Sequence, residues 1–198
     1  MPDDVARLVA SLSRPAAQSS DFDLNADVSL PQGRVLRPAA VLVAIWDGPS
    51  GPKLILTKRA SHLKHHPGQI AFAGGKVENS DAGPEAAALR EAQEEIGLDP
   101  ARVEILGQLP SHETVTGFRV IPILGHIRAD FVAMPEMDEV EEVFTVPLSL
   151  VLNPTHYTIE ARLWRGEWRR YYAVPYGPYY IWGATARILR GLADRVRI

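Results

Sequence analysis

The segment from Pro84 to Gly97 constrains the fold more than any other stretch of the chain. A proline near the start and a glycine at the end are typical of an α-helix that begins and ends within this segment. At ~100° per residue, Leu89, Ala92 and Ile96 fall on one side of that helix. An apolar side must be covered by another layer, so we expect the helix to dock on a sheet.

Short apolar segments on both sides of this helix predict the sheet. Residues 37–47 and 53–59 are separated by Asp-Gly-Pro-Ser-Gly-Pro and therefore predict a β-hairpin. Further extended segments are expected at residues 70–75, 101–110, 119–128, 139–148 and 157–176, the last turning at Arg165-Gly166-Glu167. Further helices are expected at residues 4–13, 148–152 and 181–196. This order of elements predicts a mixed sheet with helices on both faces, in an α/β or α+β domain.

Length and composition limit the other possibilities. A chain of 198 residues suits one domain, which we place at residues 36–198, after an N-terminal helix and an irregular arm at residues 1–35. There is no run of ~18 apolar residues and the net charge is −3, so neither a membrane nor nucleic acid is an expected partner. The N-terminus lacks the pattern of a secretory signal, which makes the cytoplasm the expected location. The absence of cysteine excludes thiolate metal sites and a cysteine nucleophile.

Three glutamates occupy the polar side of the 84–97 helix. Glu91 and Glu95 fall ~40° apart, and Glu94 lies ~60° to the other side of Glu91. Grouped carboxylates suit Mg²⁺ or Mn²⁺, above all when phosphate oxygens and water complete the octahedron. The helix alone leaves a second interpretation open. Glutamate favours helices, Arg90 and Glu94 form an i,i+4 pair, and many acidic helix faces are simply solvated.

The residues around the glutamates resemble the signature of the Nudix hydrolases. From Arg90 to Leu98 the sequence Arg-Glu-Ala-Gln-Glu-Glu-Ile-Gly-Leu fits that signature fully. The first half departs from it, because Asp81 stands where the common pattern has glutamate and eight residues, not seven, separate it from Arg90. The same lengthening is known from the coenzyme A pyrophosphatase branch of the family.

A motif upstream of the helix resembles that branch as well. Within residues 54–75, the positions in register are Thr57, Arg59, Ala60, Gly68, Phe72, Gly74 and Gly75. Two positions differ: Lys64 replaces an arginine, keeping the charge but losing the planar fork, and Ala73 replaces a proline. Segments 109–125, 138–148 and 179–189 are also similar, so the resemblance spans roughly residues 37–196.

The resemblance implies a Nudix-type α/β/α sandwich around a mixed β-sheet and a metal site on its helix. Glu91 and Glu95 would be the principal ligands of Mg²⁺ or Mn²⁺, and Glu94 would be a further ligand or a catalytic residue. The main-chain carbonyl of Gly74 would be an additional ligand, since glycine lets the backbone approach closely. The sequence does not show which carboxylate would act as the general base.

Three other residues would support the chemistry. Arg90 would orient the carboxylates, and Asp81 would brace the loop before the helix. Glu139 is the candidate for an acid supplied by a later loop, with a merely solvated acidic run at residues 138–142 as the alternative.

Substrate contacts are expected from the loop between the two motifs. Arg59 and Lys64 would bind phosphate groups, and Gly75 would let the substrate approach the backbone. We do not expect His65 and His66 to bind metal, because adjacent side chains diverge on a strand. Tryptophans and tyrosines between residues 164 and 182 could stack an adenine or line a pantetheine channel, but we expect them to pack in the core or in a homodimer.

Together these features predict a pyrophosphohydrolase that cleaves coenzyme A or a derivative to 4′-phosphopantetheine and 3′,5′-ADP. One alternative is a Nudix hydrolase for another nucleotide-linked diphosphate, such as ADP-ribose or a dinucleoside polyphosphate. Another is a module that senses a nucleotide without cleaving it. The complete set of Arg90, Glu91, Glu94 and Glu95 argues against that module.

Overall fold

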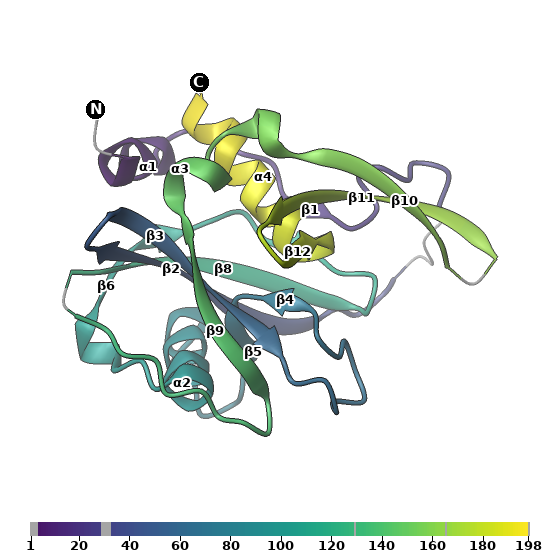
Figure 1. Cartoon of the computed structure of the whole chain (residues 1–198). Helices are drawn as coiled ribbons and strands as arrows, with labels where there is room; N and C mark the ends of the chain where they lie inside the picture. The colour runs from purple at the N-terminus through teal and green to yellow at the C-terminus, as the bar shows by residue number, and fades with distance from the viewer. Residues whose placement is uncertain (1–3, 29–32, 129, 165, 198) are drawn as a thin grey trace.

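The computed structural model describes residues 4–28, 33–128, 130–164 and 166–197, and it has a layered α/β architecture (Figure 1). The helices are α1 (Asp4–Leu12), α2 (Pro84–Ile96), α3 (Leu148–Val151) and α4 (Gly183–Arg197), with 3-10 turns η1 (Pro100–Arg102) and η2 (Pro154–His156). The strands are β1 (Ser19–Ser20), β2 (Arg37–Gly48), β3 (Gly51–Arg59), β4 (Ile70–Ala71), β5 (Ala73–Lys76), β6 (Val103–Gln108), β7 (His112–Glu113), β8 (Phe118–Ile127), β9 (Val140–Pro147), β10 (Thr158–Trp164), β11 (Glu167–Tyr176) and β12 (Tyr179–Trp182). Helix α2 covers one face of the large sheet, and α1, α3 and α4 lie on the other. The predicted α/β/α sandwich around a mixed sheet is confirmed.

The centre of the large sheet is the parallel pair β2 and β8, flanked by antiparallel strands. β2 and β3 pair only near their common turn, from Ile45–Leu54 to Gly48–Gly51, and separate beyond it. Into this opening come β5, which pairs with β2, and β4, which pairs with β3. The strand expected at residues 70–75 is therefore wrong as one element: it is two strands with different partners, interrupted at Phe72.

Helix α2 docks on the sheet through small side chains. Ala88, Ala92 and Ile96 are buried against the sheet, while Leu89 is partly buried beside them. The helix ends at Gly97, which adopts φ 69° and donates its N–H to the carbonyls of the last turn. Because glycine adopts this left-handed conformation without a Cβ penalty, the predicted end of the helix is confirmed, as is its start at Pro84.

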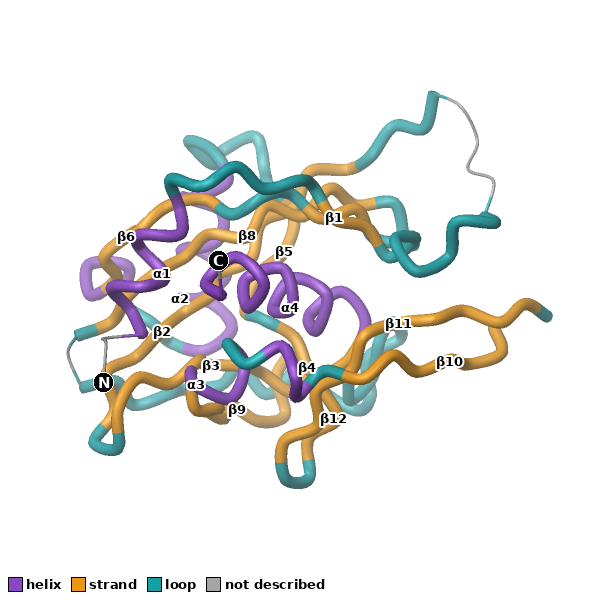
Figure 2. Tube along the Cα trace, turned by 90° about the horizontal axis from the view of Figure 1, so that it is seen from above, coloured by secondary structure: helices purple, strands orange, loops and turns teal. Residues whose placement is uncertain are grey.

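The C-terminal part of the chain adds a second, three-stranded sheet formed by β10, β11 and β12. Trp164 pairs with Glu167, which confirms the predicted hairpin turn, although Arg165 itself lies outside the described residues. Seen from above, this hairpin extends away from the body of the molecule (Figure 2). The last helix begins at Gly183, not at residue 181, because Ile181 and Trp182 belong to β12.

The arm before the domain makes specific contacts where the structure describes it. β1 pairs in parallel with β7. The Asn25 side chain accepts from the Arg170 N–H at 2.8 Å and donates to the Arg170 carbonyl at 2.9 Å, as a neighbouring strand would. Asp23 forms an ion pair with Arg187 of α4 at 2.7 Å. The arm is therefore fastened to both sheets and to α4. No helix in the described part of the chain is long and apolar enough to cross a membrane.

Candidate active site

Strand β5 places two glycines against the carboxylates of α2. The Gly74 N–H donates to Glu95 Oε2 at 3.1 Å, and Glu95 is only 4% exposed. A Cβ at Gly75 would lie 2.4 Å from Glu91 Oε1, so this carboxylate lies directly over the backbone of β5. A Cβ at Gly74 would instead lie 2.4 Å from the carbonyl oxygen of Ala40 in β2. Gly75 is therefore needed because a side chain there would collide with Glu91, and Gly74 because a side chain there would collide with the backbone of β2.

Arg90 connects the acids around the helix. Its Nε and Nη2 donate to the two carboxylate oxygens of Asp81 at 3.0 and 3.1 Å. Its Nη1 donates to Glu91 Oε1 at 3.0 Å and to Glu94 Oε2 at 3.1 Å. The paired guanidinium, together with the Glu78 N–H, lowers the pKa of Asp81. Asp81 therefore stays charged and holds the guanidinium beside Glu91 and Glu94.

Burial and mutual repulsion make the carboxylate cluster receptive to a cation. Burial raises the pKa of Glu95 to about 8, although the Gly74 N–H opposes the shift, and the charges of Glu91 and Glu139 raise it further. Burial also raises the pKa of Glu91, opposed by Arg90. A divalent cation would lower both pKa values, because it favours the charged form of a carboxylate.

The donor set fits Mg²⁺ or Mn²⁺, but the side chains are not yet arranged around an ion. Within the described ranges, no group of three or more histidine or acidic side chains is positioned to hold a metal. Arg90 occupies Glu91 and Glu94, while Glu95 accepts from Gly74. Arg90 binds one oxygen each of Glu91 and Glu94, so the other oxygen of each carboxylate could turn toward an ion beside Glu95 and supply the hard ligands that such ions prefer.

Glu139 differs from its acidic neighbours. Glu141 pairs with Lys58 at 2.6 Å, and Glu142 accepts from the Tyr179 hydroxyl at 2.5 Å. Glu139 is exposed, and its charge raises the pKa values of both Glu91 and Glu95. The loop before it is fastened to the end of α2 by a hydrogen bond from the Glu136 N–H to the Glu95 carbonyl, at 2.9 Å. Glu139 therefore lies within electrostatic reach of the helix glutamates.

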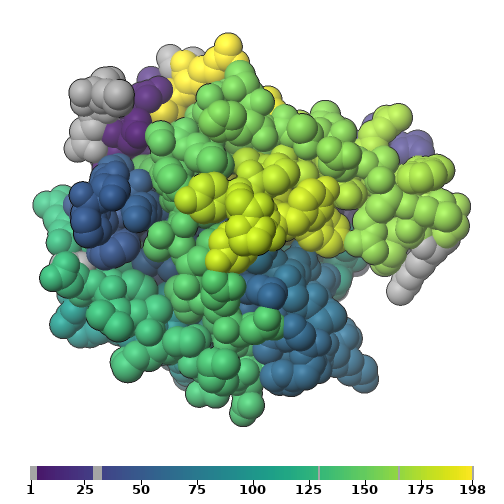
Figure 3. Space-filling model, viewed as in Figure 1, coloured from purple at the N-terminus to yellow at the C-terminus, as the bar shows by residue number. Residues whose placement is uncertain are grey.

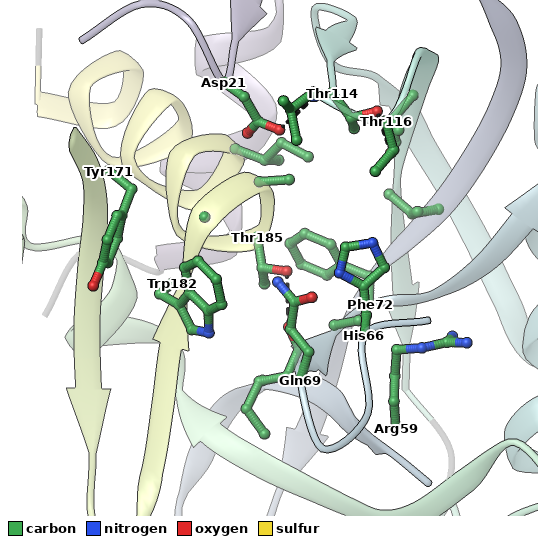
Figure 4. Close-up of a pocket in the computed structure, with 18 of the residues that line it drawn as sticks. Asp21, Arg59, His66, Gln69, Phe72, Thr114, Thr116, Tyr171, Trp182 and Thr185 are labelled. Atoms are coloured by element: carbon green, nitrogen blue, oxygen red, sulfur yellow. Dashed lines mark hydrogen bonds between the residues drawn. The ribbon is translucent and has the colours of Figure 1, made fainter. Parts of the chain in front are cut away.

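A cavity of about 680 Å³ lies on the α4 side of the sheet, and Gly74 of β5 is part of its lining. On the face seen in the space-filling view, the segment after β3 (blue) is in contact with the β11–β12 segment (yellow-green) (Figure 3). The side chains around the cavity come from the loop before β5, the start of α4 and the small sheet (Figure 4). Gly74 and Arg59 belong both to this lining and to the surroundings of Glu95. The cavity and the glutamate site therefore share Gly74 and Arg59, while no glutamate of α2 belongs to the described lining.

The expected substrate-binding residues are divided between the cavity and other surfaces. Arg59 lines the cavity. Lys64 is exposed and is not part of the described lining, and Gly75 lies against Glu91 instead. His65 and His66 are both exposed. His66 also lines the cavity and has a positive φ of 55°, which is unusual for a residue with a side chain.

The aromatic residues between positions 164 and 182 are divided in the same way. Tyr172, Tyr176 and Tyr179 pack against the core, as expected. Trp164, Tyr171 and Trp182 line the cavity instead. Trp168 and Tyr180 are exposed. The expectation of packing is therefore right for only part of the set.

The sequence interpretation missed several residues that line the cavity. These are Asp21, Gln69, Thr114, Thr116, Arg162, Arg169 and Arg170. One signal was available for the arginines: a turn at residues 165–167 places Arg162 opposite Arg169 on the predicted hairpin. Nothing in the local sequence indicates that residue 21 approaches residues 114–116.

Comparison with known proteins agrees with this architecture. Residues 36–164 match the NUDIX domain family. The chain belongs to the Nudix hydrolase family. It is 43% identical over 162 residues to a protein of Escherichia coli K12 described as the uncharacterized Nudix hydrolase NudL, covering 82% of this chain and 84% of that protein. The same values hold for NudL of Shigella boydii serotype 4.

Solved structures support the Nudix fold alone. The Nudix hydrolase RenU of M. smegmatis superposes with a TM-score of 0.50 at 20% identity, covering 61% of this chain and 83% of that one. A MutT/nudix family protein from Enterococcus faecalis gives a TM-score of 0.51 at 16% identity, covering 89% and 68%. This Nudix hydrolase is thus a pyrophosphatase, from a family that acts on small nucleotide-linked substrates and generally uses divalent ions such as Mg²⁺ or Mn²⁺.

Proposed function

We propose that this Nudix hydrolase cleaves coenzyme A or a coenzyme A derivative to 4′-phosphopantetheine and 3′,5′-ADP in the cytoplasm. The observation that carries the proposal is the position of Gly74. Its N–H binds Glu95, and the same residue lines the 680 Å³ cavity. Support also comes from the motif at residues 54–75 and from the one-residue lengthening between Asp81 and Arg90.

Binding would place the pyrophosphate at the two glycines and the rest of the substrate along the cavity. Arg59 is the cation shared by the cavity and the glutamate site, so it can attract the diphosphate and orient it. The absence of a side chain at Gly75 leaves room for the Glu91 carboxylate against the β5 backbone, and the pyrophosphate would bind beside that carboxylate. Lys64 would act only at the rim, because it is exposed.

The chemistry would be attack of water on phosphorus, with cleavage of the P–O bond that joins the two phosphates. A divalent ion held by Glu91, Glu95 and Glu94, with the Gly74 carbonyl as a further ligand, would neutralise phosphate oxygens and lower the pKa of the attacking water. Glu139 or Glu94 would accept the proton from that water. Arg90 would hold the unligated carboxylate oxygens in place.

The test is to incubate the purified protein with coenzyme A and Mn²⁺ and to identify the products by mass spectrometry. We expect 4′-phosphopantetheine and 3′,5′-ADP in equal amounts. The Glu95→Gln variant is the matched control, since it nearly preserves the side chain shape and removes the ionisable ligand. Absence of both products with the unmodified protein would refute the coenzyme A assignment.

The second candidate function is hydrolysis of another nucleotide-linked diphosphate, such as ADP-ribose or a dinucleoside polyphosphate. Two departures from the coenzyme A motif favour it: Lys64 replaces an arginine and is exposed, and Ala73 replaces a proline. A panel of these substrates, compared by kcat/KM, distinguishes the two functions because the metal site would be common to both. The highest kcat/KM for a compound other than coenzyme A would establish the second function.

A further inference from the structure

The face of the small sheet that borders the cavity carries two arginines directly opposite each other. Arg162 of β10 pairs in register with Arg169 of β11, and both side chains line the cavity. Like charges opposite each other on one face of a sheet are destabilising. An anion between or beside them would remove this repulsion.

The guanidinium of Arg169 is incompletely satisfied. Its Nη2 donates to Glu167 at 2.7 Å. Its Nε and Nη1 are buried and have no hydrogen-bond partner among the described residues. Buried donors without a partner are costly, and those of a charged group most of all. A charged guanidinium with two unpaired buried donors would be stabilised by an anion that reaches either of them.

Apart from Glu167, which pairs with Arg169, the described lining of the cavity brings little negative charge to these arginines. The acid in the described lining of the cavity is Asp21, which binds His112 Nε2 at 3.1 Å and the Val115 N–H at 2.8 Å. The carboxylate of Asp21 therefore already has hydrogen-bond partners of its own. The side of the cavity formed by β10 and β11 keeps its excess of positive charge.

Aromatic rings lie next to the arginine pair. The Arg162 guanidinium lies 5.1 Å from the centre of the Trp182 ring, and Tyr171 contacts Trp182 at 5.0 Å in a tilted arrangement. Tyr171 and Trp182 stand together on one side of the cavity, across from His66 and Arg59 (Figure 4). A basic pair beside a tryptophan suits a ligand that combines a phosphate with a planar base.

We propose that Arg162 and Arg169 bind a phosphate monoester on the nucleoside of the substrate, with the base against Trp182. The class of ligand rests on the proposed function, in which the nucleoside half is a 3′,5′-bisphosphate. Its 5′-phosphate would lie toward Gly74, and its 3′-phosphate would neutralise the arginine pair. These residues would then determine specificity for the 3′-phosphate. They lie apart from the carboxylates of α2 that would perform the cleavage.

The experiment is calorimetric titration of 3′,5′-ADP and of 5′-AMP into the full-length protein in EDTA. We expect 3′,5′-ADP to bind at least about 10-fold more tightly, the usual contribution of charge-assisted hydrogen bonds. The Arg169→Gln and Arg162→Gln variants should lose that difference and leave 5′-AMP binding nearly unchanged. Arg128→Gln is the matched control, because Arg128 is an exposed arginine that pairs with Glu104 and is not part of the described lining of the cavity.

Two outcomes would overturn the proposal: equal affinity of the unmodified protein for both nucleotides, or full discrimination in Arg169→Gln. The Arg169→Lys variant is the control for misfolding. It keeps the positive charge but loses the planar guanidinium, so its preference for 3′,5′-ADP over 5′-AMP should be intermediate. The assay requires neither metal nor turnover. A protein that discriminates through Arg169 but leaves coenzyme A intact would therefore refute the proposed function and not this site.

Discussion

Adding one methyl group to either glycine of β5 should give two different defects. In the Gly74→Ala variant, the new Cβ would lie 2.4 Å from the Ala40 carbonyl oxygen and 2.6 Å from Val41 Cα. Both atoms belong to the backbone of β2, so the β2–β5 pairing must open. In the Gly75→Ala variant, the new Cβ would meet the carboxylate of Glu91 at 2.4 to 2.7 Å. That carboxylate ends a flexible side chain and can turn away.

The magnitudes follow from what has to move. For Gly74→Ala, overpacking costs about 1–3 kcal/mol, and the φ of 154° costs a residue with a side chain about 1–2 kcal/mol more. The sum, about 2–5 kcal/mol, lowers Tm by about 4–20 °C in a protein of this size. For Gly75→Ala, Tm should change little. Displacing a carboxylate ligand by ~1 Å should lower kcat/KM by about 10²-fold.

Differential scanning calorimetry and steady-state kinetics on the same preparations separate the two effects. The reasoning requires that Gly74→Ala lose mainly stability and that Gly75→Ala lose mainly activity. A Gly75→Ala variant with unchanged kcat/KM would refute the placement of Glu91 over β5 as part of the chemistry. Equal losses of Tm in both variants would show that the two glycines serve the sheet in the same way.

Three further predictions concern the same cluster. The Glu95→Gln variant should keep its Tm within a few degrees and lose turnover, as measured by product formation with Mn²⁺; near-normal turnover would exclude Glu95 as a ligand. Because the pKa of Glu95 is raised from 4.5 to about 8 by folding, protonation stabilises the folded state at low pH. In EDTA, Tm should therefore fall as the pH rises from about 4.5 to about 8, and the Glu95→Gln variant should show a flatter profile. The Arg90→Lys variant should lose about 1–3 kcal/mol of stability, because lysine cannot make the bidentate bond to Asp81; unchanged unfolding by urea would contradict that role.

The sequence predicts best what depends on neighbouring residues. Helix α2 could be delimited from Pro84 and Gly97 because proline and glycine act within one turn of the chain. Arg90 and the three glutamates could be assigned to one patch because helical spacing alone sets their directions. The site itself needed the family resemblance, since an acidic helix face has an equally good explanation as a solvated surface.

Features that depend on distant partners were not predictable in this way. Residues 70–75 have the composition of one strand, but β2 and β3 diverge and offer two separate edges, so the segment divides at Phe72. The Asn25 amide finds its partner at Arg170, far along the chain. The cavity combines segments separated by more than a hundred residues, and no local pattern marks a set of that kind.

The absence of side chains at Gly74 and Gly75 leaves the sheet one peptide layer thick between the α2 carboxylates and the cavity beneath α4. The two halves of the site can therefore vary independently. The matched Nudix domain ends at residue 164, so β11, β12 and α4, which supply much of the cavity wall, lie beyond it. If the carboxylates of α2 perform the hydrolysis as proposed, a chain built in this way could change its preferred nucleotide by altering its C-terminal segment while α2 stays unchanged.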